Sequence, residues 1–283
     1  DWSWSRGLGD VYKRQTRVAE VLNRVISKAF KGSAPAQINI PRDMWTQVID
    51  IELPPIIKFE RPSGGIEAIK EAAKLLSNAD FPVILSGAGV VLADAINDCK
   101  ALAEKLDSPV ASGYQHNDSF PGSHPLAVGP LGYNGSKAAM ELISKADVVL
   151  ALGTRLNPFS TLPGYGIDYW PKDAAIIQVD INSDRIGLTK KVSVGICGDA
   201  KQVAQQLLNS LSSEAGNKNR DERKALIHQT KSAWLQTLSS MDHEDDDPGT
   251  SWNEEARVRD ADRMSPRMAV SYTHLRAHET NSN

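Results

Sequence analysis

The sequence predicts an α/β fold class with a doubly wound parallel sheet, and two observations carry this prediction. The first is residues 145–156 (KADVVLALGTRL), where five apolar residues follow one another and end at a glycine. A strand with one wet face alternates apolar and polar residues, so an unbroken run is typical of a strand buried on both faces. The second is a strand-then-helix rhythm after residue 65, which predicts parallel strands joined by right-handed crossovers.

Two elements are expected before this region. Apolar side chains recur at helical spacing in residues 16–31, which predicts an amphipathic helix. Residues 36–40 (AQINI) then alternate as a strand does. One helix and one strand cannot close a core alone, so we interpret residues 16–48 as the trailing edge of a domain. Residues 49–62 contain three prolines and are expected to form a semi-rigid linker.

The central domain is expected at residues 63–212, where apolar patterns predict helices and strands in alternation. Residues 113–135 are rich in Gly, Pro, His and Asn and are expected to form a long loop, which is usually functional or interfacial at this length. The helices are expected at residues 65–78, 93–106, 136–144 and 199–211, and the strands at residues 81–85, 109–111, 148–152, 174–180 and 192–197.

The sequence changes character after residue 212. Residues 213–264 are expected to hold one amphipathic helix, at residues 222–241, and then a solvated acidic linker. Ser265 and Pro266 are typical of a helix start, and we assign residues 265–270 to the entrance of a further domain.

Both ends of the chain lack a pattern that joins them to their neighbours. Residues 1–15 and 271–283 carry no apolar periodicity that continues the adjacent elements. We therefore interpret them as non-native flanks and leave them outside the fold prediction. On this interpretation the chain is a fragment of a longer protein.

Composition argues against several classes of function. The chain has 41% hydrophobic and 24% charged residues, the balance of an ordinary globular protein. A net charge of −3 predicts no nucleic-acid partner, and no apolar run approaches the ~20 residues of a membrane span. Two cysteines without a recognisable signal segment favour a reduced, cytoplasmic location.

Glycines that follow an expected strand are the first candidates for a binding site. Gly87 and Gly89 resemble the first half of the dinucleotide fingerprint, in which glycines let the backbone approach a pyrophosphate. The third glycine of that fingerprint would fall at Leu92 and is absent. A tight turn between a strand and a helix also needs glycine, so a bare turn is the alternative interpretation.

Gly153, Arg155 and Asp180 lie at the ends of two further strands, where a parallel sheet meets its ligand. The guanidinium of Arg155 could clamp an anionic group, or it could pair with a neighbouring carboxylate. Asp180 could accept a ribose hydroxyl, or it could cap the turn at residues 181–184.

Other reactive residues favour structural roles. His116, Asp118 and His124 share one expected loop without a recognisable further ligand, which favours local hydrogen bonds over a metal site. Residues 242–247 (DHEDDD) lack the glycine and spaced ligands of a calcium loop and are interpreted as a solvated charge run. Cys197 falls in an expected buried strand, which favours an inert core thiol. No nucleophile, base and orienting group can be assembled from the spacing.

Several segments together resemble the thiamine-diphosphate-dependent decarboxylase and carboligase superfamily. The end of its pyrimidine-binding domain is similar to AQINIPRD, and the entrance to its pyrophosphate-binding domain is similar to MSPR. Its Rossmann-like central domain is similar, in consecutive order, to PVILSGAGV, KADVVLALGTRL, IIQVDINSDRIG and GICGDAKQVAQQLL. The resemblance covers residues 16–269.

The resemblance implies an acetyl transfer in which sulfoacetaldehyde and phosphate give acetyl phosphate and sulfite. Residues 114–182 favour a member with this activity over acetolactate synthase or glyoxylate carboligase. The implied cofactors are thiamine diphosphate and Mg²⁺. Because the cofactor of such enzymes lies between two chains, a homodimer or homotetramer is also implied.

The residues that carry chemistry in this family are expected outside the matched segments. The resemblance implies that the glutamate that activates the cofactor precedes Thr16, and that the segment holding magnesium and the diphosphate follows Ala269. No catalytic residue and no metal ligand is therefore carried over, and we expect the chain alone to be inactive.

Two alternatives stay open beside this resemblance. In the FAD-binding branch of the superfamily, a glycine and an arginine at a strand end match Gly153 and Arg155, so an FAD or ADP site is one alternative. The other is an unrelated enzyme of the same central fold, such as an NAD-dependent deacylase. It ranks last because the chain has two cysteines and lacks a paired zinc-cysteine motif.

Overall fold

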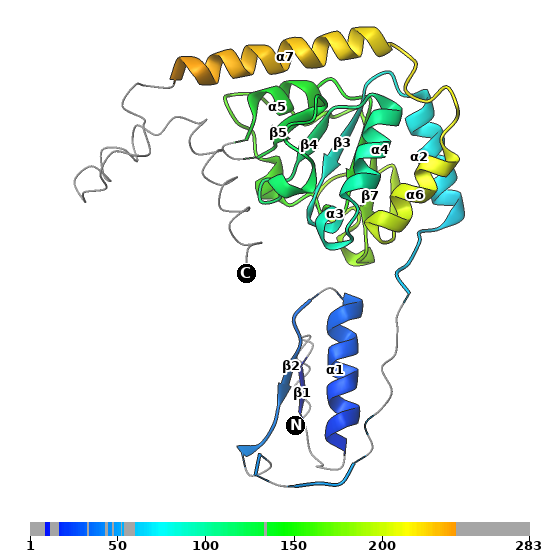
Figure 1. The fold of residues 1–283 in the computed structure, drawn as a ribbon, viewed down its shortest axis with the longest axis vertical. Helices are drawn as coiled ribbons and strands as arrows, with labels where there is room; N and C mark the ends of the chain where they lie inside the picture. The colour runs from blue at the N-terminus through cyan, green and yellow to red at the C-terminus, as the bar shows by residue number, and fades with distance from the viewer. Residues whose placement is uncertain are drawn as a thin grey trace, which may run out of the picture. The chain divides into compact units, whose positions relative to one another are not determined.

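Six parallel strands form one sheet in the computed structural model of the chain, in the order β5-β4-β3-β6-β7-β8 (Figure 1). Numbered along the chain from β3, this order is 3-2-1-4-5-6, the arrangement of doubly wound dinucleotide-binding sheets. The predicted fold class is therefore confirmed. The strands are β3 (Pro82–Ser86), β4 (Val110–Ser112), β5 (Ala127–Pro130), β6 (Val148–Leu152), β7 (Ala175–Asp180) and β8 (Val194–Cys197).

The chain divides into two compact units, Asp1–Arg61 and Pro62–Asn283. The expected acidic linker and its charge run, and the expected helix start at Ser265 and Pro266, lie outside the described residues. The structure describes residues 9–11, 17–32, 34–42, 45–46, 48–51, 53, 60–132 and 135–241.

The strand β6 lies near the middle of the sheet and pairs along its whole length with β3 on one side and β7 on the other. All five residues of β6 are buried, as are all five residues of β3. A strand with a neighbour at each edge and helices over each face exposes no side to water. This burial explains why residues 148–152 carry no polar side chain.

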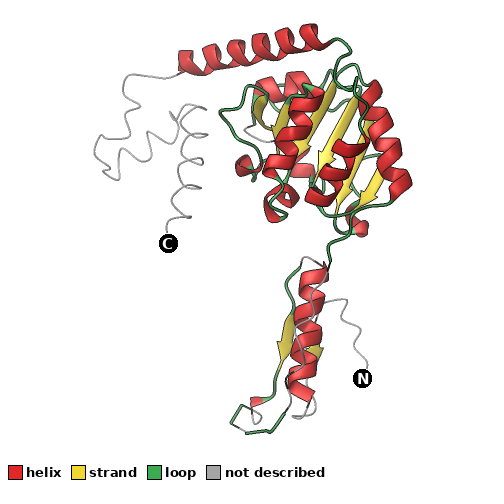
Figure 2. Cartoon of the chain, turned by 45° about the vertical axis from the view of Figure 1, so that its right-hand side comes forward, coloured by secondary structure: helices red, strands yellow, loops and turns green. Residues whose placement is uncertain are grey.

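Helices flank the sheet, and Figure 2 shows them in red on either side of the yellow strands. Among the described residues, each helix that the sequence predicted in the central region is present, and α3 is an addition that the sequence did not predict. No helix in these parts of the chain is both long and apolar enough to cross a lipid bilayer. The helices are α2 (Ile66–Asn78), α3 (Ala88–Leu92), α4 (Ile96–Leu106), α5 (Lys137–Ile143), α6 (Ala200–Ser210) and α7 (Arg220–Met241).

The expectation of one long loop at residues 113–135 is wrong in part. This region contains a 3-10 turn, η3 (Asn117–Ser119), and the edge strand β5, which pairs with β4 through an irregular register. The sequence of β5 is AVGP, and its glycine and proline are typical of turns. Proline has no backbone N–H group to donate, whereas a central strand donates N–H groups to a neighbour on each side. Proline therefore fits an edge strand such as β5.

The strand β8 is present, but its burial differs from the expectation. Its residues alternate between buried and exposed, so one face of β8, the other edge strand of the sheet, meets water. Cys197 is exposed, so the prediction of a buried core thiol at this position is wrong. Cys99, which lies in α4, is buried.

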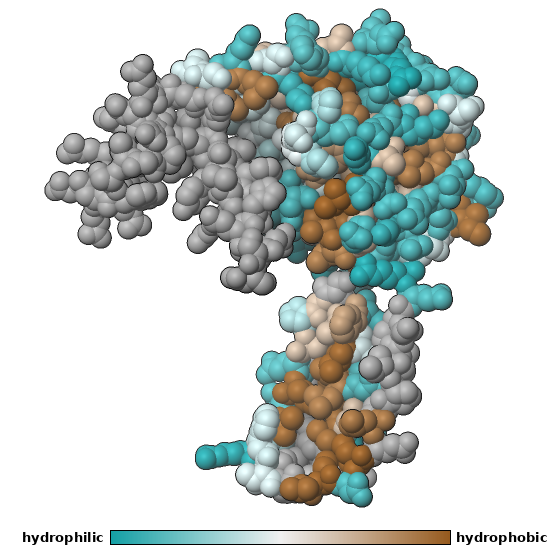
Figure 3. Space-filling model, in the orientation of Figure 1, coloured by the Kyte–Doolittle hydropathy of each residue, from teal (hydrophilic) through white to brown (hydrophobic). Residues whose placement is uncertain are grey.

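In the smaller unit, the described residues form one helix and two short parallel strands, and their core is small. Val21 and Val25 form that core with partly buried residues around β2. Figure 3 shows further apolar side chains in brown on this unit. Phe30 is 75% exposed. That residues 1–15 are non-native stays a prediction, although three of them form β1. The elements are β1 (Gly9–Val11), α1 (Val18–Gly32) and β2 (Gln37–Asn39).

Candidate functional site

The carboxyl ends of β3 and β6 meet at the point where the strand order reverses. From β3 the chain winds outward through β4 and β5, and from β6 it winds the opposite way through β7 and β8. In sheets of this type, ligands bind in the crevice beyond such a switch point. The fold brings all five predicted site residues to this edge of the sheet, namely Gly87 and Gly89 after β3, Gly153 and Arg155 after β6, and Asp180 at the end of β7.

The glycines at this edge are in direct backbone contact. The amide of Gly89 donates to the carbonyl of Gly153 at 2.8 Å, and the amide of Gly87 donates to the carbonyl of Leu152 at 3.1 Å. A Cβ atom on Gly89 would lie 2.6 Å from Gly153 Cα, and Gly153 itself has a φ of +62°. Glycine is therefore required for a close approach between two turns. The two amides that could have met a phosphate are already bonded within the protein.

Arg155 is a charged residue of this edge whose side chain is exposed. Within the part of the chain that the structure describes, its guanidinium has no hydrogen bond or ion pair. The turn around it is fixed, because the amide of Leu156 donates to Thr154 Oγ1 at 3.2 Å and Thr189 Oγ1 donates to the carbonyl of Leu156 at 2.7 Å. An anion-binding role for Arg155 stays a prediction, and the described residues offer no carboxylate partner for the alternative role.

Asp180 is buried at the end of β7. Its Oδ1 accepts the amide of Asn182 at 2.9 Å, so the carboxylate caps the turn that follows the strand. Its carbonyl accepts the amide of Gly198 at 3.0 Å, which continues the pairing of β7 with β8. The turn-capping role is therefore confirmed, and a contact with a ribose stays a prediction.

Gln178 is a residue of this edge that the sequence reasoning missed. It is 1% exposed, and its Nε2 donates to the carbonyls of Thr154 and Arg185, both at 3.2 Å. Its Oε1 accepts the amide of Gly187 at 2.8 Å. The side chain thereby ties the turn after β6 to the turn after β7. The available signal was a single polar residue in an apolar strand, because a buried polar group must find partners.

Each loop histidine lies beside a carboxylate. His116 Nδ1 lies 3.8 Å from Asp118 Oδ1, whereas His124 Nε2 lies 3.2 Å from Glu104 Oε1. His124 Nδ1 accepts the amide of Leu126 at 3.2 Å, so both ring nitrogens of His124 have partners. The described ranges contain no group of three His, Cys, Asp or Glu side chains placed to hold a metal ion.

Two buried groups, the thiol of Cys99 and the phenol of Tyr169, have raised pKa values, and neither provides a catalytic group. Burial raises the pKa of the Cys99 thiol to about 12, against a smaller opposing effect of a hydrogen bond with Ser86. Burial also raises the pKa of Tyr169 to about 12. A thiol or phenol that stays neutral at physiological pH is a poor nucleophile. Among the described residues, the geometry gives no nucleophile with a base beside it.

Comparison with protein families places the sheet within a known family model. Residues 69–207 match the family model described as the central domain of thiamine pyrophosphate enzymes. These residues begin in α2 and end in α6, so the match contains the whole six-stranded sheet.

Curated relatives extend the similarity beyond the sheet. The chain is 78% identical over 252 residues to a probable sulfoacetaldehyde acetyltransferase of Rhizobium meliloti (strain 1021), covering 89% of this chain and 43% of that protein. It is 74% identical over 254 residues to a sulfoacetaldehyde acetyltransferase of Roseovarius nubinhibens, covering 90% of this chain and 42% of that protein. The chain therefore spans about two fifths of the length of these relatives.

A solved structure resembles the fold. Benzoylformate decarboxylase from Polynucleobacter necessarius superposes with a TM-score of 0.62 at 22% identity, covering 75% of this chain and 39% of that chain. At this identity the likeness supports the fold and carries no information on substrate.

Proposed function

We propose that this chain forms part of a sulfoacetaldehyde acetyltransferase. Its residues 69–207 match the central domain of the thiamine pyrophosphate enzymes. The proposed reaction converts sulfoacetaldehyde and phosphate into acetyl phosphate and sulfite. The observation that carries the proposal is the high identity to two proteins named for this activity, which extends over almost the whole chain.

The proposed role of the central domain within that enzyme is structural. Magnesium needs oxygen ligands that converge on one point, and the described residues contain no group of three His, Cys, Asp or Glu side chains placed to hold a metal ion. The amides of Gly87 and Gly89 are bonded to the backbone of the neighbouring strand. The described residues therefore do not fit a thiamine diphosphate–magnesium site, and no step of the reaction is assigned to them.

A segment graft tests the proposal. Residues 62–241 of this chain replace the matching segment of the Roseovarius nubinhibens relative, and sulfite release from sulfoacetaldehyde and phosphate is measured. We expect the graft to release sulfite at a rate within an order of magnitude of the parent enzyme. A matched graft from an acetolactate synthase should release less. A folded graft of this chain without sulfite release would contradict the proposal.

A nucleotide site at the crevice is the second candidate function, and the exposed guanidinium of Arg155 favours it. FAD or ADP would place its anionic phosphates near that charge. We expect ADP or FAD to raise the melting temperature of the chain, because a ligand that binds the folded state stabilises it. Arg155→Ala should abolish the rise. Lys145→Ala, which removes an exposed charge before β6 rather than after it, should preserve the rise. No rise in the unmodified chain would reject the site.

The proposal extends to four further details. They are Mg²⁺ as the metal, phosphate as the acetyl acceptor, a homodimer or homotetramer, and a cytoplasmic location. Light scattering on the active graft tests the assembly, and a monomeric active graft would reject that part of the proposal.

A further inference from the structure

The long helix α7 packs against the rest of the larger unit along one stripe of side chains. Its buried residues are Arg223, Ile227, Thr230 and Leu238, which recur at helical spacing. Two of these four residues are polar, so apolar burial alone does not account for the position of the helix. Its attachment depends on specific polar and aromatic contacts at a few points.

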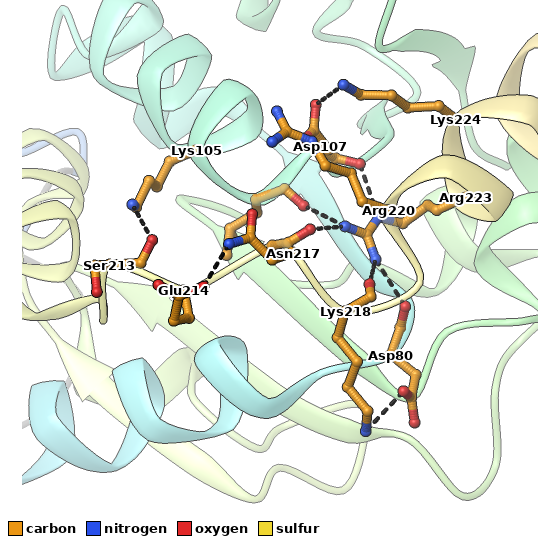
Figure 4. Close-up of polar contacts among 12 residues, drawn as sticks. Asp80, Lys105, Asp107, Ser213, Glu214, Asn217, Lys218, Arg220, Arg223 and Lys224 are labelled. Carbon is orange, nitrogen blue, oxygen red and sulfur yellow. Dashed lines mark hydrogen bonds and ion pairs between the residues drawn. The ribbon is translucent and has the colours of Figure 1, made fainter.

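The first point is Arg223, near the beginning of α7. Its side chain is 1% exposed, and all of its hydrogen-bond donors face backbone carbonyls (Figure 4). Nε donates to the backbone carbonyl of Asp107 at 3.0 Å. The two terminal nitrogens donate to four further carbonyls. Burial lowers the pKa of Arg223, and the carboxylate of Asp107 partly offsets this effect. The four other carbonyls belong to Asp80, Leu106, Gly216 and Lys218.

These carbonyls include the C-terminal end of α4, where helical carbonyls lack partners within the helix. Asp107 ends α4 in the left-handed region with a φ of +47°, and its carboxylate pairs with Arg220 and with Lys224, the latter at 3.1 Å. A Cβ atom on Gly216 would lie 2.6 Å from the carbonyl of Lys105, so the connection before α7 also packs closely on α4. The beginning of α7 is therefore fixed to the end of α4.

The second and third points lie farther along α7. Lys231 Nζ donates to the carbonyl of Pro125 at 2.7 Å and to that of His124 at 3.3 Å, which are the residues that lead into β5. The ring of Trp234 meets the ring of Tyr165 edge to face, with centroids 5.5 Å apart. Through Tyr165, the helix contacts a segment of irregular structure.

Tyr165 belongs to the segment between Arg155 and β7. Its backbone has a φ of +54°, a conformation that a non-glycine residue keeps only when its surroundings hold it. Its hydroxyl donates to the carbonyl of Gly135 at 3.0 Å, and the amide of Ile167 donates to the carbonyl of Gly164 at 2.9 Å. The position of this segment therefore depends on Tyr165, and Tyr165 contacts Trp234.

We propose that α7 is a latched strap, in which Arg223 fixes the helix to α4 and the fixed helix holds Tyr165 through Trp234. The strap thereby positions residues 156–167, the segment that follows Arg155 at the carboxyl edge of the sheet. A change that releases the latch at Arg223 is transmitted to this segment over the length of the helix.

Hydrogen exchange on the full 283-residue chain tests the strap. In Arg223→Lys, an ammonium cannot satisfy five carbonyls, so amides of α7 and the amide of Ile167 should exchange at least tenfold faster. Amides of β3 and β6 should keep their protection. Arg220→Lys is the matched control, because at this half-exposed side chain a lysine keeps the positive charge that pairs with Asp107, and it should leave Ile167 unchanged.

A second variant separates the latch from the strap. Trp234→Ala should speed exchange at Ile167 at least tenfold while the first two turns of α7 keep their protection, whereas Leu235→Ala, at an exposed neighbour, should change neither. If Arg223→Lys does not fold, exchange at Ile167 in Trp234→Ala alone tests whether α7 positions residues 156–167. Unchanged exchange at Ile167 in Trp234→Ala, or in a folded Arg223→Lys, would overturn the proposal.

Discussion

At the scale of single residues, the carboxyl edge of the sheet depends on glycines that have no room for a side chain. Gly89 and Gly153 approach each other so closely that a Cβ atom on Gly89 would lie 2.6 Å from Gly153 Cα. The atoms that this Cβ atom would meet are backbone atoms of Gly153, which cannot rotate away as a side chain can. The packing of the two turns therefore requires these glycines, whether or not a ligand binds.

This packing predicts a loss of stability in Gly89→Ala. We expect the free energy of unfolding to fall by about 1–3 kcal/mol, the usual range for overpacking a close contact. Gly65→Ala is the matched control, because nothing lies within 4 Å of the added Cβ atom and its φ is negative. Urea unfolding followed by circular dichroism measures both variants. Equal stability of the two variants would contradict the packing argument.

The two cysteines should differ in reactivity. Cys99 is buried with its pKa raised to about 12, whereas Cys197 is exposed. We expect iodoacetamide at neutral pH to modify Cys197 in the native chain and to spare Cys99 until the chain unfolds. Because the folded pKa of Cys99 lies above the unfolded value, its contribution to stability is complete below the unfolded pKa and is lost as the pH rises toward 12. Mass spectrometry of the native chain reads the modification, and early labelling of Cys99 would count against its burial.

Some of these residue roles could be predicted from the sequence, and others could not. The turn-capping role of Asp180 follows from an acidic residue at the end of an apolar strand. The partners of Arg223 could not be predicted, because they are backbone carbonyls contributed by residues more than a hundred positions away as well as by nearby ones. Sequence patterns report which side chains are apolar, and they carry no record of which carbonyls lack a partner.

At the scale of elements, α6 illustrates how a helix start is fixed. Asp199 precedes α6 and its Oδ1 accepts the amides of Lys201 at 3.1 Å and Gln202 at 3.3 Å. These amides have no partner within the helix. The capped helix then buries Ala200, Val203, Ala204 and Leu207 in the core.

Removing this cap should therefore destabilise the larger unit. We expect Asp199→Ala to lower the free energy of unfolding by about 1–2 kcal/mol, and Asp199→Ser to restore most of the loss, because serine also caps helices. Asp184→Ala, at an exposed position, should have little effect. Thermal unfolding followed by circular dichroism compares the three variants, and a serine variant no better than alanine would argue against capping.

The strand that the sequence pattern missed, β5, and the strand whose burial it misjudged, β8, share a physical cause. The strand β5 contains glycine and proline, and the strand β8 has one exposed face, and both lie at edges of the sheet. Edge strands meet water and need fewer apolar residues and fewer amides than central strands. The pattern of β5 therefore resembles that of a loop, and the pattern of β8 does not reveal its exposed face, whereas β6 was predictable because it has neighbours on both sides.

At the scale of the whole molecule, the fold gathers the candidate residues at one edge without assembling a catalytic centre from the described residues. The strand order brings Gly87, Gly89, Gly153, Arg155 and Asp180 together. The glycines pack against backbone and Asp180 caps a turn, which leaves Arg155 as the candidate for a ligand. The proposed acetyl transfer therefore assigns the chemistry to parts of the enzyme other than this sheet.

Sulfite release by the purified 283-residue chain alone is the most direct test of a structural role for this domain. The chain is supplied with sulfoacetaldehyde, phosphate, thiamine diphosphate and Mg²⁺, and the Roseovarius nubinhibens relative serves as the positive control. We expect release from the relative and none above the protein-free blank from the chain. Sustained turnover by the chain would contradict that role, because catalytic groups would then have to lie within these residues.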